Sequence, residues 1–312
     1  MVEQSAFRKL WVGLLCSTSV LAAIPAAMAE SAPVQPFTPL STPATHRILP
    51  GKIVFSMLVT PDLTKAQAFY SQLFGWSFRA VGDGKIPRVE ILQGTRPIGT
   101  MVAHAQLHPA RDTPFWIPFI STSDTATVAR VTRRQRGKVL FGPHQITGLG
   151  QTVIVSDPQH GIYAALSAQA GDPADQPGDP TLNTWSWATL LAPNPKEEAG
   201  YYQLLFNYKV MAAPEADNGS HFIIASQDKE RASLNTLPDG MEERDHARWI
   251  QFVQVGNTAD AANRATALGG EVIVPPHVDR DGAIVAILSD PSGAVFGVIE
   301  AQKDLLEMGA AQ

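Results

Sequence analysis

Two kinds of side chain in this sequence could take part in acid–base catalysis or in metal-assisted catalysis. The first is a single carboxylate, Glu90, which is flanked by Val89 and Ile91 in a segment that is predicted to be a β-strand. A strand carboxylate that faces a cavity can have a raised pKa and act as a general base, whereas one at an edge or on an outer face is simply solvated. We take Glu90 as the candidate catalytic residue and leave both interpretations open.

The second kind is histidine, whose imidazole nitrogen can bind a divalent metal ion. His104 and His108 have the spacing of a helical ligand pair, but Pro109 and the preceding strand place them in a connection, where solvated side chains are the simpler interpretation. Cys16 is the only cysteine, so thiolate ligands and disulfides are not expected in the mature chain. The eight histidines are His46, His104, His108, His144, His160, His221, His246 and His277.

These residues lie in a sequence that contains a long internal repeat. Thr60-Pro61-Asp62 and the following Phe69-Tyr70 return as Ala192-Pro193-Asn194 and Tyr201-Tyr202. Four later landmarks recur at one offset of 133 residues: Trp116, Gly137, Pro143-His144 and Asp157-Pro158 become Trp249, Gly270, Pro276-His277 and Asp290-Pro291. A repeat of this length predicts two domains of one type.

Each copy divides again into two units of one strand, one helix and three strands. In the first unit, Ile53–Thr60 is predicted to be a strand, and apolar residues at helical spacing follow until Phe74-Gly75, where glycine suits the position past a helix end. Further strands are expected at 76–80, 88–92 and 98–103. The second unit is expected as strand 115–121, helix 126–136 and strands 138–141, 150–156 and 162–166. Units three and four should occupy 185–237 and 248–301, with Asn218-Gly219 as a hairpin turn.

The N-terminal region has the pattern of an export signal. Arg8 and Lys9 precede an apolar run that ends at Ala27-Met28-Ala29, the order of charged, apolar and cleavable regions. We expect cleavage after Ala29, with a retained anchor as the alternative, and therefore a periplasmic or secreted protein without stable membrane insertion. The expected organisation is signal peptide 1–29, proline-rich linker 30–51 as an extended tether, domain one 52–167, linker 168–182, domain two 183–302 and tail 303–312.

Composition limits the partners. Of 312 residues, 45% are hydrophobic and 17% are charged, and the net charge is −5. This is the composition of a globular protein without the basic surface that nucleic acid requires. We therefore expect no nucleic-acid partner.

The strand–helix–three-strand unit, used in pairs, resembles the vicinal-oxygen-chelate superfamily, which contains glyoxalase I, the bleomycin-resistance proteins and the extradiol dioxygenases. Thr60-Pro61-Asp62, Phe69-Tyr70 and Phe74-Gly75-Trp76 resemble the family's turn and helix pattern, and Asp290-Pro291 to Phe296 resembles its closing pattern. The resemblance covers residues 52 to 301. It implies an α+β fold of two tandem domains, each a curled mixed sheet around a cleft that holds a divalent metal in the enzymes.

The same resemblance allows the metal ligands to be placed. The family's first-strand histidine falls on Val54 or Phe55, Ile117, Ala188 and Ile250, and its acidic positions fall on Met57, Thr189, Ala165 and Gly297. Apolar or weakly coordinating residues stand at all of them. We therefore expect no metal cofactor, although a divalent metal with relocated ligands stays possible. His144 and His277 share a position in the repeat, for which a role in the fold or contact with a ligand are both open.

Tryptophans on or near the first strands give the main clue to binding. If they face the family's cleft, they would form an aromatic pocket for a small organic molecule; if not, they fill the core. Polar contacts would come from tyrosine, threonine or glutamine nearby. The candidate ligand-binding residues are Met57, Trp116, Trp187, Thr189, Tyr202, Trp249 and Gln251.

The resemblance thus implies an exported protein, monomer or homodimer, that binds a small molecule without a catalytic metal, as bleomycin-resistance proteins do. One alternative is a lyase or dioxygenase of the glyoxalase type, with relocated metal ligands or with Glu90 as an acid–base catalyst. That alternative predicts that at least two of His104, His144, Glu90, His221 and His277 converge. A third alternative is a structural or partner-binding protein whose clefts are filled by its own side chains.

Overall fold

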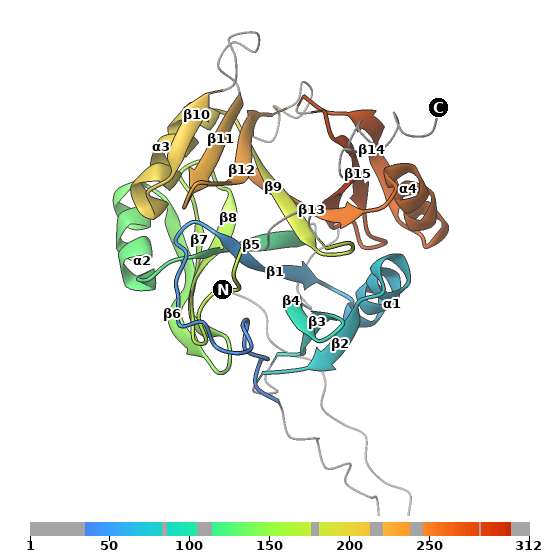
Figure 1. Ribbon diagram of the computed structural model, residues 1–312, viewed down its shortest axis with the longest axis horizontal. Coiled ribbons are helices and arrows are strands. Elements are labelled where there is room, and N and C mark those ends of the chain that lie inside the picture. The colour runs from blue at the N-terminus through green and yellow to red at the C-terminus, as the bar shows by residue number, and fades with distance from the viewer. Residues whose placement is uncertain are drawn as a thin grey trace, which may run out of the picture. The chain divides into compact units, whose positions relative to one another are not determined.

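The computed structural model describes residues 35–82, 86–104, 114–175, 181–212, 221–237, 246–280 and 282–300. Over these residues the chain forms two eight-stranded sheets and four helices (Figure 1). The strand orders are β2-β3-β4-β1-β5-β8-β7-β6 and β10-β11-β12-β9-β13-β16-β15-β14, so the second sheet repeats the first. The α+β fold of two tandem domains, each of two paired units, is confirmed.

The first domain follows the predicted order of elements. The first unit pairs its opening strand with its own last strand in parallel and with the opening strand of the second unit antiparallel. The elements are β1 (Ile53–Thr60), α1 (Leu63–Phe74), β2 (Ser77–Ala80), β3 (Arg88–Gln93), β4 (Arg96–Ala103), β5 (Phe115–Ser121), α2 (Thr125–Arg134), β6 (Lys138–Ile146), β7 (Gly150–Ser156) and β8 (Ile162–Ala168).

The second domain has the same arrangement, with β9 joining β12 in parallel and β13 antiparallel. Its elements are β9 (Trp185–Ala192), α3 (Pro195–Phe206), β10 (Lys209–Ala212), β11 (His221–Ser226), β12 (Lys229–Thr236), β13 (Arg248–Val255), α4 (Thr258–Ala267), β14 (Glu271–Val278), β15 (Ile284–Ser289) and β16 (Val295–Glu300).

Local sequence explains where the helices begin and end. The Asp62 carboxylate accepts a hydrogen bond from the backbone N–H of Lys65 and caps α1, and Asn194 does the same for α3 through Glu197. Gly75 ends α1 in the left-handed conformation with φ 72°, and Asn207 takes the equivalent place after α3 with φ 54°. Glycine and asparagine are the residues that tolerate this conformation best.

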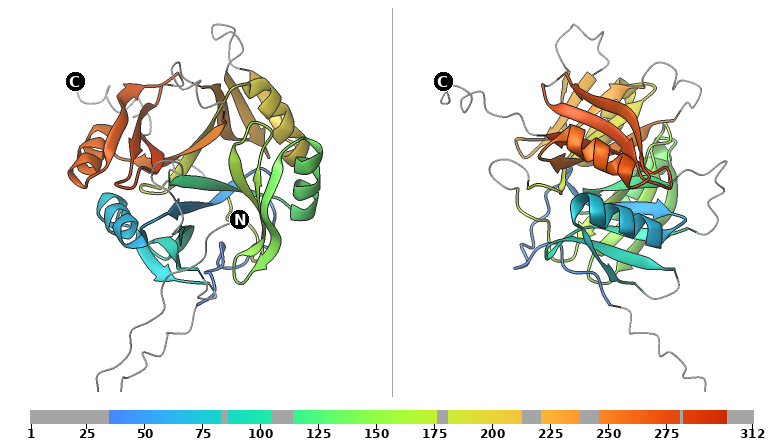
Figure 2. Two further views of the ribbon diagram at one scale, coloured as in Figure 1. Left: turned by 180° about the vertical axis from the view of Figure 1, so that it is seen from behind. Right: turned by 90° about the vertical axis from the view of Figure 1, so that its right-hand side faces the viewer.

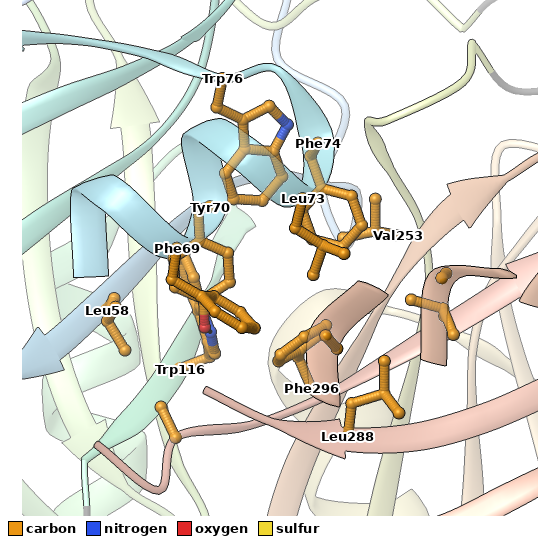
Figure 3. Close-up of a cluster of buried hydrophobic side chains, with 14 of the residues drawn as sticks. Leu58, Phe69, Tyr70, Leu73, Phe74, Trp76, Trp116, Val253, Leu288 and Phe296 are labelled. Atoms are coloured by element: carbon orange, nitrogen blue, oxygen red, sulfur yellow. Dashed lines mark hydrogen bonds between the residues drawn. The ribbon is translucent and has the colours of Figure 1, made fainter. Parts of the chain in front are cut away.

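The main cores are shared between the two domains. One hydrophobic cluster joins α1 of the first unit to α4, β15 and β16 of the fourth, and Figure 3 shows Phe69, Tyr70 and Phe74 beside Phe296. The other cluster joins α2 and β7 of the second unit to α3 and β9 of the third. In both views of Figure 2, α1 lies beside α4, and in the left view α2 lies beside α3. Arg264 of α4 also donates to the last-turn carbonyls of α1, at Gln72 and Leu73.

The proline-rich segment differs from the sequence expectation. We expected an extended tether, but residues 35–51 pack against the first domain, where Phe37 and Leu40 are 3% and 4% exposed. The linker after β8 is also held, because the Asp172 carboxylate accepts from the Leu49 N–H. A segment rich in proline can still bury apolar side chains between its bends, and Phe37 and Leu40 do so here.

Several sequence predictions fall outside the described residues. These are the signal peptide 1–29, the tail 303–312, the Asn218-Gly219 turn and His108. Among the residues that are described, no helix has the length and apolar character needed to cross a membrane.

Candidate functional site

Each sheet has one face that packs against the helices and a second face that we call the inner face. Side chains alternate along a strand, and on β1 the odd-numbered Phe55 and Met57 join a cluster separate from that of Leu58. The strand register places Thr189 of β9 at the position of Met57, because each pairs with the same point of its neighbouring strands. Inner-face positions can therefore be compared between domains.

The inner face of the first sheet is covered by the chain itself. Phe37 and Leu40 join Phe55, Met57 and Ile117 in one buried cluster. Met57, a predicted ligand contact, is therefore in contact with residues of the protein rather than open to a ligand.

Glu90 lies at the end of this covered face and is fully buried. Its two oxygens accept from the backbone N–H and the hydroxyl of Thr38, at 2.7 and 2.8 Å, and one of them pairs with the Arg79 guanidinium at 2.7 Å. Both oxygens of this candidate base are thus engaged by protein donors.

The inner face of the second sheet carries a polar group between apolar residues. The Thr189 and Ser233 hydroxyls are hydrogen-bonded at 2.8 Å, and the Trp187 indole N–H donates to Ser233 Oγ at 3.3 Å. Two residues further along β12, Asn235 is paired with His221 of β11 through a side-chain hydrogen bond. The sequence-predicted Trp187 and Thr189 are therefore brought together.

Exposure distinguishes the two inner faces. Phe55 and Ile117 are 2% and 3% exposed in the first domain, whereas Trp187 and Ile250, at the equivalent positions, are only partly buried. Ile223, at the position of Glu90, is partly buried as well. The second face thus combines partly exposed apolar side chains with the buried hydroxyl groups of Thr189 and Ser233. Apolar surface with a few oriented polar groups is the usual composition of a small-molecule site.

Three other predicted ligand contacts lie between the domains instead. Trp116 donates to the Tyr70 hydroxyl, and Trp249 donates to the Tyr202 hydroxyl, each at 3.0 Å. The Tyr202 hydroxyl in turn donates to Asp157 at 2.9 Å. These aromatic side chains fill the shared cores, which is the alternative that the sequence left open.

The tyrosine contacts explain the repeated Asp-Pro turns. Asp157 and Asp290 each accept backbone N–H bonds within their own turn and a tyrosine hydroxyl from a helix of the other domain, with Tyr70 donating to Asp290 at 3.3 Å. Gln251, also a predicted ligand contact, accepts from the Ser56 hydroxyl across the same junction. The repeat landmarks hold the two domains together.

A pair of acids is buried at one of these junctions. The Gln159 N–H donates to both Asp157 and Glu198, at 3.0 and 3.1 Å. Burial raises the pKa of Asp157 to about 7, and burial together with the charge of Asp157 raises the pKa of Glu198 to about 9. Burial disfavours the ionised form of a carboxyl, so Glu198 holds a proton at neutral pH.

The described residues at the ligand positions that the resemblance predicts do not fit a divalent metal. Phe55, Ile117 and Ile250 occupy positions where the family has ligands, while Ala188 and Ala165 face a shared core. Glu90 lies beside the Arg79 cation, which opposes a second cation there. Over the described ranges, no three His, Cys, Asp or Glu side chains lie close enough to hold a metal ion. We derive no metal-dependent step.

The histidines are dispersed over different elements. His144 and His277 are exposed on β6 and β14, where His144 contacts the Phe141 ring and His277 bonds the Pro275 carbonyl. His160 and His246 contact each other on the surface. His46 and His104 are also exposed, and among the seven histidines that the structure describes only His221 is buried, on an inner face.

Ser233 and Asn235 were missed by the sequence analysis. Serine and asparagine in a strand carry no distinctive spacing, and their role depends on the parallel pairing of β12 with β9. The alternation of Ser233 and Asn235 with buried Ala232 and Leu234 was the available signal.

The two tandem domains have the strand order and the paired units that the vicinal-oxygen-chelate resemblance implies. The chain is similar to the Mn(II)-bound glyoxalase from Novosphingobium aromaticivorans, at 13% identity and a TM-score of 0.57 over 82% of this chain and 84% of that one. It is also similar to the 2,3-dioxygenase LapB from Pseudomonas sp. KL28, at 12% identity and a TM-score of 0.56 over 82% and 93%.

The sequence comparisons agree with the fold. Residues 52–165 match the model of the Glyoxalase/Bleomycin resistance protein/Dioxygenase superfamily. The anthracycline biosynthesis protein DauV of Streptomyces sp. (strain C5) is 24% identical over 81% of this chain and 94% of its own length. Residues 52–165 therefore resemble this superfamily in sequence, and the strand order of the second domain repeats that of the first.

Proposed function

We propose that the protein binds a small organic molecule with a planar apolar part on the inner face of the second sheet, without a metal. The observation that carries the proposal is the hydrogen-bonded group of Trp187, Thr189 and Ser233, set among partly buried apolar residues. Trp187 and Ile250 would contact the planar part. Thr189, Ser233 and Asn235 would bond its polar substituents.

The relatives guide the choice of probe. The name of DauV refers to anthracycline biosynthesis, and anthracyclines carry a fused planar ring system. A dihydroxyanthraquinone therefore presents the type of ring and substituents that this face would accommodate. Stacking of such a ring on an indole contributes beyond simple burial.

The test is a calorimetric titration of chelator-treated protein with dihydroxyanthraquinone. We expect saturable binding that Trp187→Ala weakens about tenfold or more, since the loss of one large aromatic contact amounts to about 1.4 kcal/mol or more. Phe55→Leu changes the equivalent, covered position in the first domain and should leave affinity unchanged. Absence of binding, binding that requires added Mn(II), or equal effects of both variants would contradict the proposal.

The polar group can be tested separately. Ser233→Ala removes the hydroxyl that Thr189 and Trp187 share and should weaken binding of the same probe several-fold while leaving the fold intact, because a polar contact contributes about 0.5–1.5 kcal/mol. Ser226→Ala, in the neighbouring strand of the same sheet, is the control.

We also propose that residues 1–29 direct export and are removed. The support is the order of charged, apolar and small residues at the N-terminus. Sequencing the N-terminus of protein recovered from its native compartment should give Glu30 first. A chain that still begins at Met1 would contradict cleavage.

A further inference from the structure

The first domain holds a second candidate site, and it is already filled. Glu90 of β3 faces Arg79 of β2 across the antiparallel pair, and the guanidinium bonds one carboxylate oxygen at 2.7 and 3.2 Å. The carboxylate of Glu90 can accept hydrogen bonds from a bound segment, and the guanidinium of Arg79 can donate hydrogen bonds to the same segment.

The segment from Gln35 to Ser41 uses all of these groups. Thr38 donates its backbone N–H to one oxygen of Glu90 and its hydroxyl to the other. The Arg79 guanidinium donates to Thr38 Oγ1 at 2.8 Å and to the Pro36 carbonyl at 3.0 Å. Glu90 and Arg79 therefore bind Thr38 through both its backbone and its side chain.

Backbone contacts hold the same segment in an extended form. Gln35 forms a parallel bridge with Val81 and accepts from the Gly82 N–H. On the other side, the Phe37 N–H donates to the Thr147 carbonyl at 3.2 Å. Gly148 permits this approach, since a Cβ there would lie 2.2 Å from the Phe37 carbonyl oxygen. Backbone pairing with a host protein is a known mode of peptide recognition.

Apolar side chains complete the site. Phe37 packs edge-on against Phe55, with ring centroids 6.1 Å apart, and Phe55 packs in the same way against Phe119. Leu40 joins the same cluster. Phe37 and Leu40 are buried three residues apart, and Thr38 between them is hydrogen-bonded to Glu90. These contacts predict that the site prefers a particular sequence pattern.

We propose that the inner face of the first sheet is a binding site for an extended peptide of the pattern aromatic–Thr–any–apolar, occupied in the free protein by residues 35–41 of the same chain. The segment excludes other molecules from this face, so the small-molecule site lies in the second domain alone. This inference does not depend on what the second domain binds.

The test uses the full chain and a fluorescein-labelled synthetic peptide with the sequence of residues 34–43. The double variant Phe37→Ser, Leu40→Ser should release the segment and bind the peptide, with a rise in fluorescence anisotropy. The unmodified protein should bind the peptide at least tenfold more weakly, because its own segment competes at high effective concentration. A peptide with valine in place of Thr38 should bind the double variant at least tenfold more weakly.

Two outcomes would overturn the inference. One is equal peptide binding by the unmodified protein and the double variant; the other is absence of binding to a double variant that circular dichroism shows to be folded. A milder variant covers the case in which the double variant does not fold. In the Thr38→Val variant, the rate of amide hydrogen exchange at positions 37 and 38 should increase at least tenfold. The exchange rates in β9 and β12 should be unchanged. Unchanged protection at Phe37 would overturn the inference as well.

Discussion

At the level of single residues, two buried tyrosine hydroxyl groups form hydrogen bonds between the two domains. Tyr202 lies between Trp249, which donates to it, and Asp157, which accepts from it; Tyr70 occupies the equivalent place with a longer bond to Asp290. Because these groups are buried, a lost partner leaves a polar atom without compensation.

Tyr202→Phe should lower the free energy of unfolding by about 1–3 kcal/mol, the usual cost of leaving buried polar groups unpaired. Tyr70→Phe is the matched variant and should cost less, since its bond to Asp290 is 3.3 Å rather than 2.9 Å. Urea unfolding measures both values. Equal effects, or no effect of Tyr202→Phe, would show that the hydroxyls contribute little.

The buried acids predict a pH dependence. The pKa values of Asp157 and Glu198 are raised to about 7 and about 9 in the folded chain, whereas in the unfolded chain both should be near 4. Stabilisation by the bound protons is complete below about pH 4 and is lost as the pH rises through 7 to 9. Tyr163, Tyr201 and Tyr202 face the same acids, and burial raises the pKa of each.

The urea midpoint should therefore fall between about pH 6 and about pH 9.5. Glu198→Gln removes one of the two acids and should flatten this fall. Glu197→Gln, at its exposed neighbour on α3, should change the slope much less, because the charge of Glu197 contributes less to the raised pKa of Glu198 than burial and Asp157 do. A midpoint that rises with pH over this range would contradict the raised pKa values of Asp157 and Glu198.

At the residue scale, sequence reasoning identified burial better than partners. Tyr202 and Trp249 were predicted as ligand contacts, with packing in the core as the alternative for the tryptophan. The sequence pattern of one element does not reveal whether a helix, a ligand or another domain covers it. Trp187 and Thr189 meet on the second inner face, and whether a ligand binds them stays a prediction. Glu90 was recognised as unusual, but its partner Thr38 lies 52 residues away in a segment that was expected to be unpacked.

Glycines show how the elements constrain substitution. Gly200 lies in α3 with open space around its Cβ position, whereas a Cβ on Gly99 of β4 would lie 2.7 Å from the Ser56 carbonyl oxygen of β1. Gly200→Ala should stabilise the protein by about 0.5–1 kcal/mol because alanine is the better helix former. Gly99→Ala should destabilise it by about 1–3 kcal/mol through overpacking. Thermal unfolding of both variants tests the opposite signs.

The elements themselves were predictable because the repeat supplied two independent samples of one pattern. The starts of β1 and β5 and the end of α1 match their predicted positions. β6 is longer than expected and runs through Pro143 to Ile146. Register shifts between β6 and β7 accommodate the proline, and a single-strand pattern does not encode such irregularities.

At the scale of the whole molecule, the cores join unit one to unit four and unit two to unit three. A first half produced alone, residues 35–175, would expose Phe69, Tyr70 and other core side chains. We expect it to self-associate in sedimentation velocity, since large exposed apolar patches drive association. Addition of the second half should restore a one-to-one complex, and a stable, monomeric first half would contradict the shared cores.

The covered first face and the open second face also bear on evolution of the duplicated chain. Glu90 and Phe55 contact Thr38 and Phe37, so a substitution at either position must preserve the fit of an internal segment. Trp187, at the position of Phe55, and Ile223, at the position of Glu90, are only partly buried. Equivalent positions of the two copies thus differ in how much change each can tolerate.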